Sequence, residues 1–246
     1  MSKKLDYRVA WTDAISLLSA HREAVVAVAG FFIFLASWVF AVYTPEIGTQ
    51  GTETPQQILS LLQNHFATNW MYFLPVIIAG SYGGFVIYVL LLAPDISRVG
   101  DALTVGLSGF LPYFIASLLV GWIAMLGFVA FLIPGLYLTA RFTPLPTVMA
   151  ADPKLGIVDS IRQSWTLTNG IGWRTFFLLF VVWMASWLLI NVANMLIGEI
   201  CSSVVGQEGL PLVETFFAAL FSTAQAVLII ALVTAIYRQL KPQIVS

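Results

Sequence analysis

The feature of this sequence that most constrains its fold is the distribution of its Lys and Arg residues. Long apolar stretches are separated by polar segments, and these segments alternate between having basic residues and having none. Segments 43–69 and 198–210 have none, whereas the others contain Lys3, Lys4, Arg8, Arg22, Arg98, Lys154, Arg162, Arg174, Arg238 and Lys241. Cytoplasmic loops of membrane proteins carry an excess of Lys and Arg. The pattern therefore predicts a polytopic membrane protein with its N- and C-termini in the cytoplasm.

The composition favours the same location. The chain is 59% hydrophobic and 9% charged, whereas soluble domains carry roughly 25% charged residues. A net charge of −1 argues against nucleic acid as a partner, which would require a basic patch. The expected partners are the lipid bilayer and, in addition, other membrane proteins or a second copy of the chain. The single cysteine, Cys201, excludes an intrachain disulfide and a cysteine-rich metal site, and we expect no cofactor.

The apolar stretches predict an all-α bundle that forms one integral membrane domain over residues 1–246. About 20 apolar residues in a helix cross the hydrocarbon core. Six spans are expected, at about 24–43, 70–92, 106–133, 136–150, 173–197 and 211–237.

The third and fourth spans come from one apolar run that is too long for one span and short for two. Pro134-Gly135 interrupts this run, and such a pair is a strong turn signal. Six spans also place every basic segment on the cytoplasmic side, which five would not. Pro144 and Pro146 break the short fourth span. A broken span can mark a transporter binding site, and a re-entrant or surface segment is the alternative.

Three short helices are expected outside the spans. The first precedes the first span and is either an amphipathic lead-in on the cytoplasmic face of the membrane or a cytosolic extension of the span. The second begins at Thr54-Pro55-Gln56-Gln57, which has the pattern of a capping box with Pro at the first helical position. The third carries Ile157, Ile161 and Trp165 at helical spacing and ends at Asn169-Gly170.

Gly80 and Gly84 form a pair of small residues, four apart, in the second span. Such pairs let two helix backbones approach closely in lipid. Packing within the molecule is favoured over a homodimer contact.

Arg141 is the most unusual residue, because it falls inside the predicted fourth span. A basic residue at membrane depth tends to face the bundle interior and to pair with an acid. Glu214, one turn into the sixth span, is the expected partner, and Glu199 is the second candidate. The pair is interpreted either as a structural ion pair, which is favoured, or as a site for an anionic substrate or headgroup.

Catalytic groups do not gather in the sequence. His21 and His65 are solitary and fall at different membrane edges, so a metal site is not expected, and the serines lack a histidine base. Asn191, Asn194 and Gln225 are interpreted as interhelical hydrogen-bonding groups, with the lining of a polar path as the alternative.

The segment Ile133–Arg141, followed by Pro144, Asp152 and the run Ile161–Gly170, resembles the YciC-type family of bacterial inner-membrane proteins. It is more loosely similar to the membrane domain of some glycerophosphoryl diester phosphodiesterases. The resemblance covers about residues 81–187. It implies a six-span inner-membrane protein of uncharacterised function and supplies no catalytic residues.

These observations predict a non-enzymatic, multi-pass protein of the bacterial inner membrane, acting in envelope or lipid homeostasis as a scaffold or partner-binding module. The alternative is a transporter or lipid-handling permease with its site near Arg141.

Overall fold

The computed structural model describes residues 5–44, 54–93 and 98–241, without the side chains of 202–210. Every regular element in these residues is a helix. Lys3, Lys4 and residues 45–53 of the first segment without Lys or Arg lie outside the described residues.

The chain begins with an amphipathic helix, α1 (Tyr7–Ala20), as the sequence predicts. Asp6 caps it, because its carboxylate accepts hydrogen bonds from the backbone of Arg8 and Val9. The buried face consists of Ala10, Ala14 and Leu17.

The first predicted span is a continuous helical segment, Arg22–Tyr43. It consists of α2 (Arg22–Val28), a π-helical stretch η1 (Ala29–Leu35) and α3 (Ala36–Tyr43). Gly83, in the second predicted span, passes close to Phe32 in this π-helical stretch.

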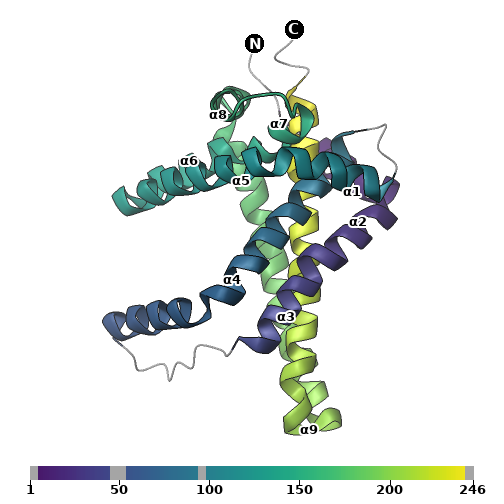
Figure 1. Cartoon of the computed structure of the whole chain (residues 1–246), viewed down its shortest axis with the longest axis vertical. Helices are drawn as coiled ribbons and strands as arrows, with labels where there is room; N and C mark the ends of the chain where they lie inside the picture. The colour runs from purple at the N-terminus through teal and green to yellow at the C-terminus, as the bar shows by residue number, and fades with distance from the viewer. Residues whose placement is uncertain (1–4, 45–53, 94–97, 242–246) are drawn as a thin grey trace.

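The second predicted span is the C-terminal part of α4 (Pro55–Leu92). The predicted capping box is confirmed: Gln57 N donates to Thr54 Oγ1, and Thr54 N donates to Gln57 Oε1 at 2.8 Å. The expected surface helix therefore continues directly into the span. Pro75 lies inside α4, and the helix bends along its length (Figure 1).

Helices α5 (Val99–Ala130) and α6 (Leu132–Phe142) form a hairpin around Phe131, whose backbone is extended. The predicted turn at Pro134-Gly135 is thus displaced by a few residues, and this pair lies in the first turn of α6. Figure 1 shows the α5–α6 hairpin projecting sideways, across the direction of α9.

Two short helices follow, α7 (Leu145–Ala151) and α8 (Ile157–Leu167). The predicted end of α8 is confirmed, since Gly170 has a φ of 78°, which favours glycine.

The last helix, α9 (Gly172–Leu240), doubles back on itself in two arms (Figure 1). Gln225 of the second arm contacts Trp183 of the first, and Glu214 lies against Gly198. The two arms contain the fifth and sixth predicted spans.

The described residues contain five helices that are long and apolar enough to cross a membrane: Arg22–Tyr43, α4, α5, Gly172–Cys201 and Pro211–Leu240. The predicted fourth span, 136–150, is not a single helix. It consists of most of α6 and of α7, with a break at Thr143-Pro144. The break arises because Pro144 lacks a backbone N–H and its ring excludes a continuous helix.

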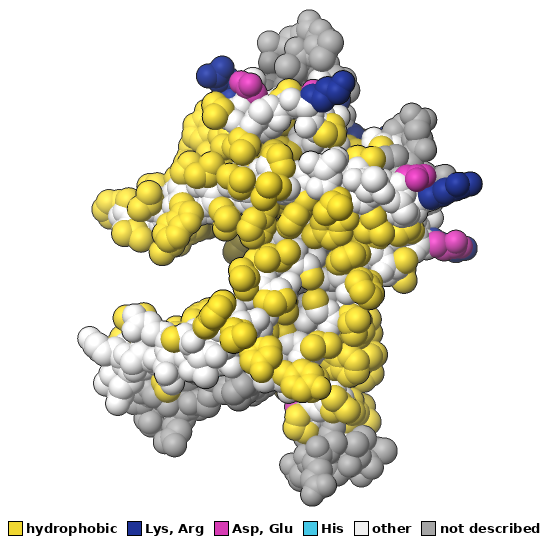
Figure 2. Space-filling view, in the orientation of Figure 1, with side chains coloured by type: hydrophobic (Ala, Val, Ile, Leu, Met, Phe, Trp, Pro, Cys, Tyr) yellow, Lys and Arg dark blue, Asp and Glu magenta, His cyan; other side chains and the backbone are white. Residues whose placement is uncertain are grey.

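The buried core lies where the first span, α4, α5 and the second arm of α9 meet. Its fully buried side chains include Val28, Phe85, Ile87, Leu90 and Leu232. On the face drawn in Figure 2, the Lys and Arg side chains gather at the end of the molecule that holds α1 and α8, and none is visible at the opposite end. The sequence contains no Lys or Arg between residues 175 and 237.

Candidate functional site

Arg141 lies at the C-terminal end of α6, where this helix meets α8 and the start of α9. Its side chain is 4% exposed. The guanidinium carbon is 4.2 Å from the ring centroid of Trp165 in α8 and 5.7 Å from that of Tyr137, one turn earlier in α6. A cation over an aromatic face is attracted by the ring quadrupole, more strongly when water is excluded. These two rings therefore stabilise the buried charge.

The backbone of Arg141 is fixed by α8 as well. Its carbonyl oxygen accepts hydrogen bonds from Ser164 Oγ and Thr168 Oγ1, each at 3.1 Å, and both of these residues are fully buried. This carbonyl is one of the last in α6, so it has no partner inside its own helix. The two hydroxyl groups satisfy it and attach the end of α6 to α8.

The structure does not bring Arg141 and Glu214 together. Arg141 contacts Gly172 at the start of α9, where a Cβ would meet its side chain at 3.3 Å. Glu214 lies against Gly198, near the other end of the same arm, ~39 Å away along a helix with a rise of 1.5 Å per residue. The predicted ion pair is therefore not formed, because α6 ends beside α8 instead of running to the end of the bundle that holds Glu214. Glu199 is likewise at the far end of that arm.

A polar cavity of about 590 Å³ lies where Glu214 is placed, between the end of α3 and the two arms of α9. Thr44, Asn194 and Glu214 are among its lining residues, together with Ala41, Val42, Pro211, Thr215 and Ala218. Thr44 Oγ1 and Asn194 Oδ1 are buried without a hydrogen-bond partner among the described residues. A buried polar group without a partner is costly, so its presence calls for an explanation.

The predicted Gly80–Gly84 pair contacts other helices only weakly. A Cβ on Gly80 would meet nothing within 4 Å, and one on Gly84 would be 3.6 Å from Ile230. The close approach occurs at Gly83 instead, where a Cβ would lie 2.5 Å from Cβ of Phe32 in η1. The contact is within the molecule.

Gly135 serves the packing of the α5–α6 hairpin. A Cβ there would overlap the ring of Phe128, and a Cβ on Gly127 would be 3.0 Å from Cα of Gly135. The hairpin is apolar on its surface as well, since the sequence has no charged residue between Asp101 and Arg141. At its tip, Val129 is 75% exposed and Phe131 is 76% exposed.

Pro144 lies at the break between α6 and α7, and Pro146 lies in the first turn of α7. The carbonyl of Pro144 accepts a hydrogen bond from Thr147 Oγ1 at 2.6 Å and one from Val148 N at 3.0 Å. These are bonds of the first turn of α7, so that helix begins directly after the break.

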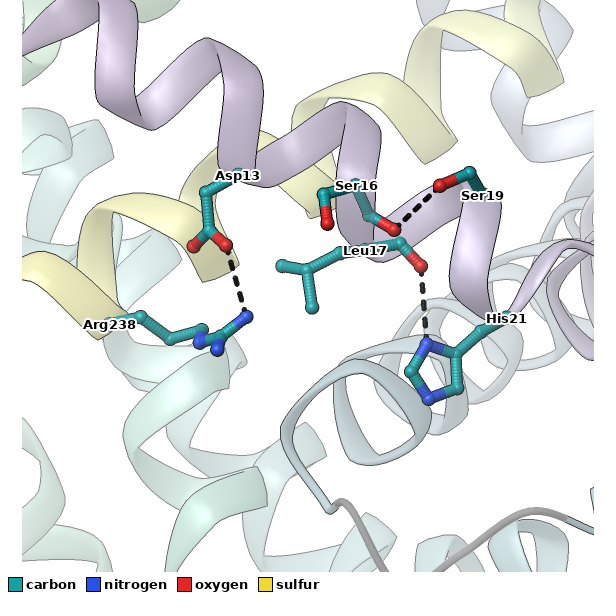
Figure 3. Close-up of polar contacts among 6 residues, drawn as sticks. All are labelled: Asp13, Ser16, Leu17, Ser19, His21 and Arg238. Carbon is teal, nitrogen blue, oxygen red and sulfur yellow. Dashed lines mark hydrogen bonds and ion pairs between the residues drawn. The ribbon is translucent and has the colours of Figure 1, made fainter.

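The first and last helices are joined at the basic end of the molecule. Arg238 of α9 donates to Asp13 of α1 at 3.2 Å, as Figure 3 shows, and the amide of Gln239 donates to the carbonyl of Asp6. His21 contacts the carbonyl of Leu17 in its own helix through Nδ1. These contacts hold the two ends of the described chain together.

The other ionisable groups are dispersed. Among residues 5–44, 54–93 and 98–241, no group of three or more His, Cys, Asp or Glu side chains could hold a metal ion. The ring of His65 packs against Phe66 and Phe73. Of the predicted interhelical groups, Gln225 bonds across the two arms of α9, whereas Asn191 bonds to Trp187 O within its own arm.

Sequence reasoning identified Arg141 and missed its surroundings. The signal for Tyr137 was its position four residues earlier, which places both side chains on one helical face. Trp165, Ser164 and Thr168 carried no such signal, because their contact with Arg141 depends on how α8 folds back. Thr44 also carried no signal in the sequence, because its place beside the cavity depends on how α3 packs against α9.

Comparisons of the chain with protein-family models, with curated proteins and with solved structures found no match.

Proposed function

We propose that this chain is a non-enzymatic scaffold of the bacterial inner membrane, with both ends cytoplasmic, which embeds the α5–α6 hairpin in the cytoplasmic leaflet. In this proposal the chain crosses the bilayer four times, through Arg22–Tyr43, the second half of α4 and the two arms of α9. An even number of crossings between basic segments keeps all of them on one side of the membrane. The same requirement led to the prediction of six spans from the sequence.

The length of α6 is the observation that carries the proposal. This helix has 11 residues, so it spans only ~16 Å at 1.5 Å per residue. Its C-terminal end is attached to α8 through Arg141, on the side of Arg162 and Arg174. The tip at Phe131 therefore reaches at most about half of the ~30 Å hydrocarbon core from that side, and the sideways direction of the hairpin (Figure 1) keeps it within the same leaflet. The α6 arm of the hairpin is therefore too short to cross, and the hairpin is too apolar for water.

The exposed apolar tip of the hairpin supports a lipid environment. Exposed apolar patches of this kind are not stable in water and mark membrane or protein contacts. The backbone groups in the interior of a helix bond within it, as the hydrocarbon core requires, and most of those in α5 and α6 do so. An element that occupies area in one leaflet favours curvature towards that leaflet, and this is how the scaffold would act on the envelope.

Cysteine accessibility tests the topology. Single cysteines are placed at Arg98, Val129 and Lys154 in a Cys201→Ser background, and a membrane-impermeant maleimide is added to either face. We expect labelling at 98 and 154 from the cytoplasmic face alone, and none at 129 from either face. Labelling of a cysteine at Val129 from the outer face would show that α5 crosses, and would reject the proposal.

A curvature assay tests the role. In membrane tubes pulled from giant vesicles, the protein should be enriched on tubes whose convex side is the cytoplasmic leaflet. The matched control carries Val129→Ser, Phe131→Ser and Ile133→Ser, which make the tip polar and should remove the enrichment. Equal density of the unmodified protein on tubes and flat membrane would contradict a scaffold that acts on curvature.

A transporter or lipid-handling permease with its site near Arg141 has less support, because aromatic rings cover that side chain. We propose in addition that the chain belongs to the YciC-type family that residues 81–187 resemble.

A further inference from the structure

We infer that the groove between the first span and α4 holds an acyl chain of a membrane phospholipid. The span Arg22–Tyr43 touches α4 at two points. Near the middle of the span, a Cβ on Gly83 would lie 2.5 Å from Cβ of Phe32. Near its C-terminal end, the ring centroids of Phe40 and Phe73 are 4.7 Å apart. The groove occupies the stretch between these two contacts.

A bend in one helix and two small side chains open the groove. Pro75 lies inside α4 between the two contacts, and α4 bends along its length (Figure 1). Ala36 of the first span and Ala79 of α4 have the smallest side chains in the lining. The two helices therefore separate between their contacts and leave a cavity of about 370 Å³.

The groove offers apolar contacts almost exclusively. Tyr72 is the only lining residue with a polar side-chain atom, and the sequence has no Lys, Arg, Asp or Glu at 24–45 or 54–94. Phe31, Leu35 and Val39 recur every four residues and are exposed along one rim, and Met71 is exposed on the other. Left empty, these walls would lack partner atoms and lose their dispersion contacts.

The depth of the groove limits its occupants to hydrocarbon and protein. Phe32 and Phe40 lie at most ~15 Å and ~27 Å from Arg22 along the helix, so the groove falls within the ~30 Å hydrocarbon core. Water is excluded there. This placement requires only that the first span and α4 are embedded in the membrane. The inference is therefore independent of the α5–α6 hairpin and of the role proposed for it.

The width of the groove favours an acyl chain over a helix of a second copy. The groove is ~12 Å long, from Phe32 to Phe40, at 1.5 Å per residue. A helix with its side chains is about 10–12 Å wide, so it would need roughly 900 Å³ or more over this length. A single hydrocarbon chain, whose carbons lie about 4 Å from their neighbours, needs roughly 150–250 Å³. The cavity of about 370 Å³ holds such a chain and is too small for a helix.

Photolabelling tests the occupant. The full chain in detergent is titrated with phosphatidylcholine that carries a diazirine on one straight acyl chain, and mass spectrometry locates the labelled residues. We expect labelling at 31–40 and 71–79 that saturates and that unlabelled straight-chain lipid displaces. Val181 and Leu189 of α9, which are 61% and 69% exposed, should be labelled in proportion to lipid, without saturation.

Competition with other lipids tests the recognition. Straight-chain phosphatidylglycerol should displace the label as well as phosphatidylcholine does, because the lining has no charge to distinguish their headgroups. Diphytanoyl phosphatidylcholine should compete several-fold less well, because its methyl branches widen the chain. Equal competition by the branched lipid would contradict a groove that fits one straight chain.

Variants that fill the groove test the site. Ala36→Leu and Ala79→Leu should each lower the saturable labelling several-fold. Ala185→Leu is the matched control, since it makes the same change at an exposed position of α9 outside the groove, and it should leave the labelling unchanged. Circular dichroism establishes that each variant is folded before its labelling is read.

A cysteine at the rim tests the competing occupant. Leu35→Cys in a Cys201→Ser background should stay monomeric on oxidation, because a lipid and not a second copy lies over the groove. Disulfide-linked dimers would show that a second copy occupies it and would overturn the inference. Labelling at 31–40 that never saturates, or unchanged labelling in folded Ala36→Leu and Ala79→Leu proteins, would overturn it as well.

Discussion

Gln225 donates a hydrogen bond from its side-chain amide to Ser186 Oγ, 2.9 Å away, and so links the two arms of α9. The same nitrogen also donates to Trp183 O at 3.0 Å. In lipid, an interhelical hydrogen bond contributes about 0.6 kcal/mol on average and rarely more than ~1.7 kcal/mol. Gln225→Leu should therefore lower the free energy of unfolding by about 1 kcal/mol, measured by denaturant titration in detergent. Asn191→Leu is the control, because that amide bonds within its own arm, and it should cost less. A larger loss for Asn191→Leu would contradict this account.

Gly83→Ala and Gly80→Ala should have opposite consequences, although both place a methyl group on α4. At Gly83 the new carbon would meet Phe32 at 2.5 Å, whereas at Gly80 it would meet open space. Forcing an extra carbon into a packed contact costs roughly 1–3 kcal/mol. We expect a lower unfolding midpoint for Gly83→Ala and no loss for Gly80→Ala. If the two variants unfold alike, η1 and α4 do not approach as closely as described.

Arg141 and Trp165 should be energetically coupled. A double-mutant cycle with Arg141→Met and Trp165→Leu is expected to give a coupling energy of about 1–2 kcal/mol, because the stacked cation is shielded from water. Arg162 is exposed on the same helix as Trp165, so the cycle with Arg162→Met should give a value near zero. Equal coupling for both arginines would argue against a specific cation–π contact.

Arg141 and Glu214 should act independently. Their positions at opposite ends of one α9 arm mean that the effects of Arg141→Met and Glu214→Gln on the free energy of unfolding should add, within about 0.5 kcal/mol. Strongly non-additive effects in the double variant would instead support the ion pair that the sequence predicted.

Ser164 and Thr168 share one acceptor, the carbonyl of Arg141. Either hydroxyl can satisfy it, so Ser164→Ala and Thr168→Val should each cost only about 1 kcal/mol. Removing both leaves a buried carbonyl with no side-chain partner, so the double variant should lose more than the sum of the two. Simple additivity in chemical denaturation would show that the carbonyl finds another donor.

The local features of this fold were predictable from short stretches of sequence. The capping box at Thr54 and Gln57, the end of α8 at Gly170 and the length of the first span each depend on neighbouring residues alone. The distribution of Lys and Arg along the sequence predicted which segments lie together at the basic end of the molecule. These signals come from backbone hydrogen bonding and from the cost of burying charge, which act over a few residues.

The arrangement of the third and fourth apolar stretches was not predictable in the same way. A hydropathy profile reports only the length of a segment and how apolar the segment is. By both criteria α5 could be a membrane span. Its sideways direction is set by packing on α4, where Gly106 and Gly109 meet Val86 and Phe85, and by the early end of α6. The surroundings of Arg141 and of Glu214 were hidden for the same reason, since each combines helices that are distant in the chain.

The link between Asp13 and Arg238 joins residues 225 positions apart. A ribosome releases the chain from the N-terminus onwards, so α1 emerges early and its docking partner emerges almost last. Throughout synthesis, the apolar face of α1 with Ala10, Ala14 and Leu17 has no site to occupy. Biogenesis must therefore keep this helix apart, on the membrane surface or on a chaperone, until the second arm of α9 has been inserted.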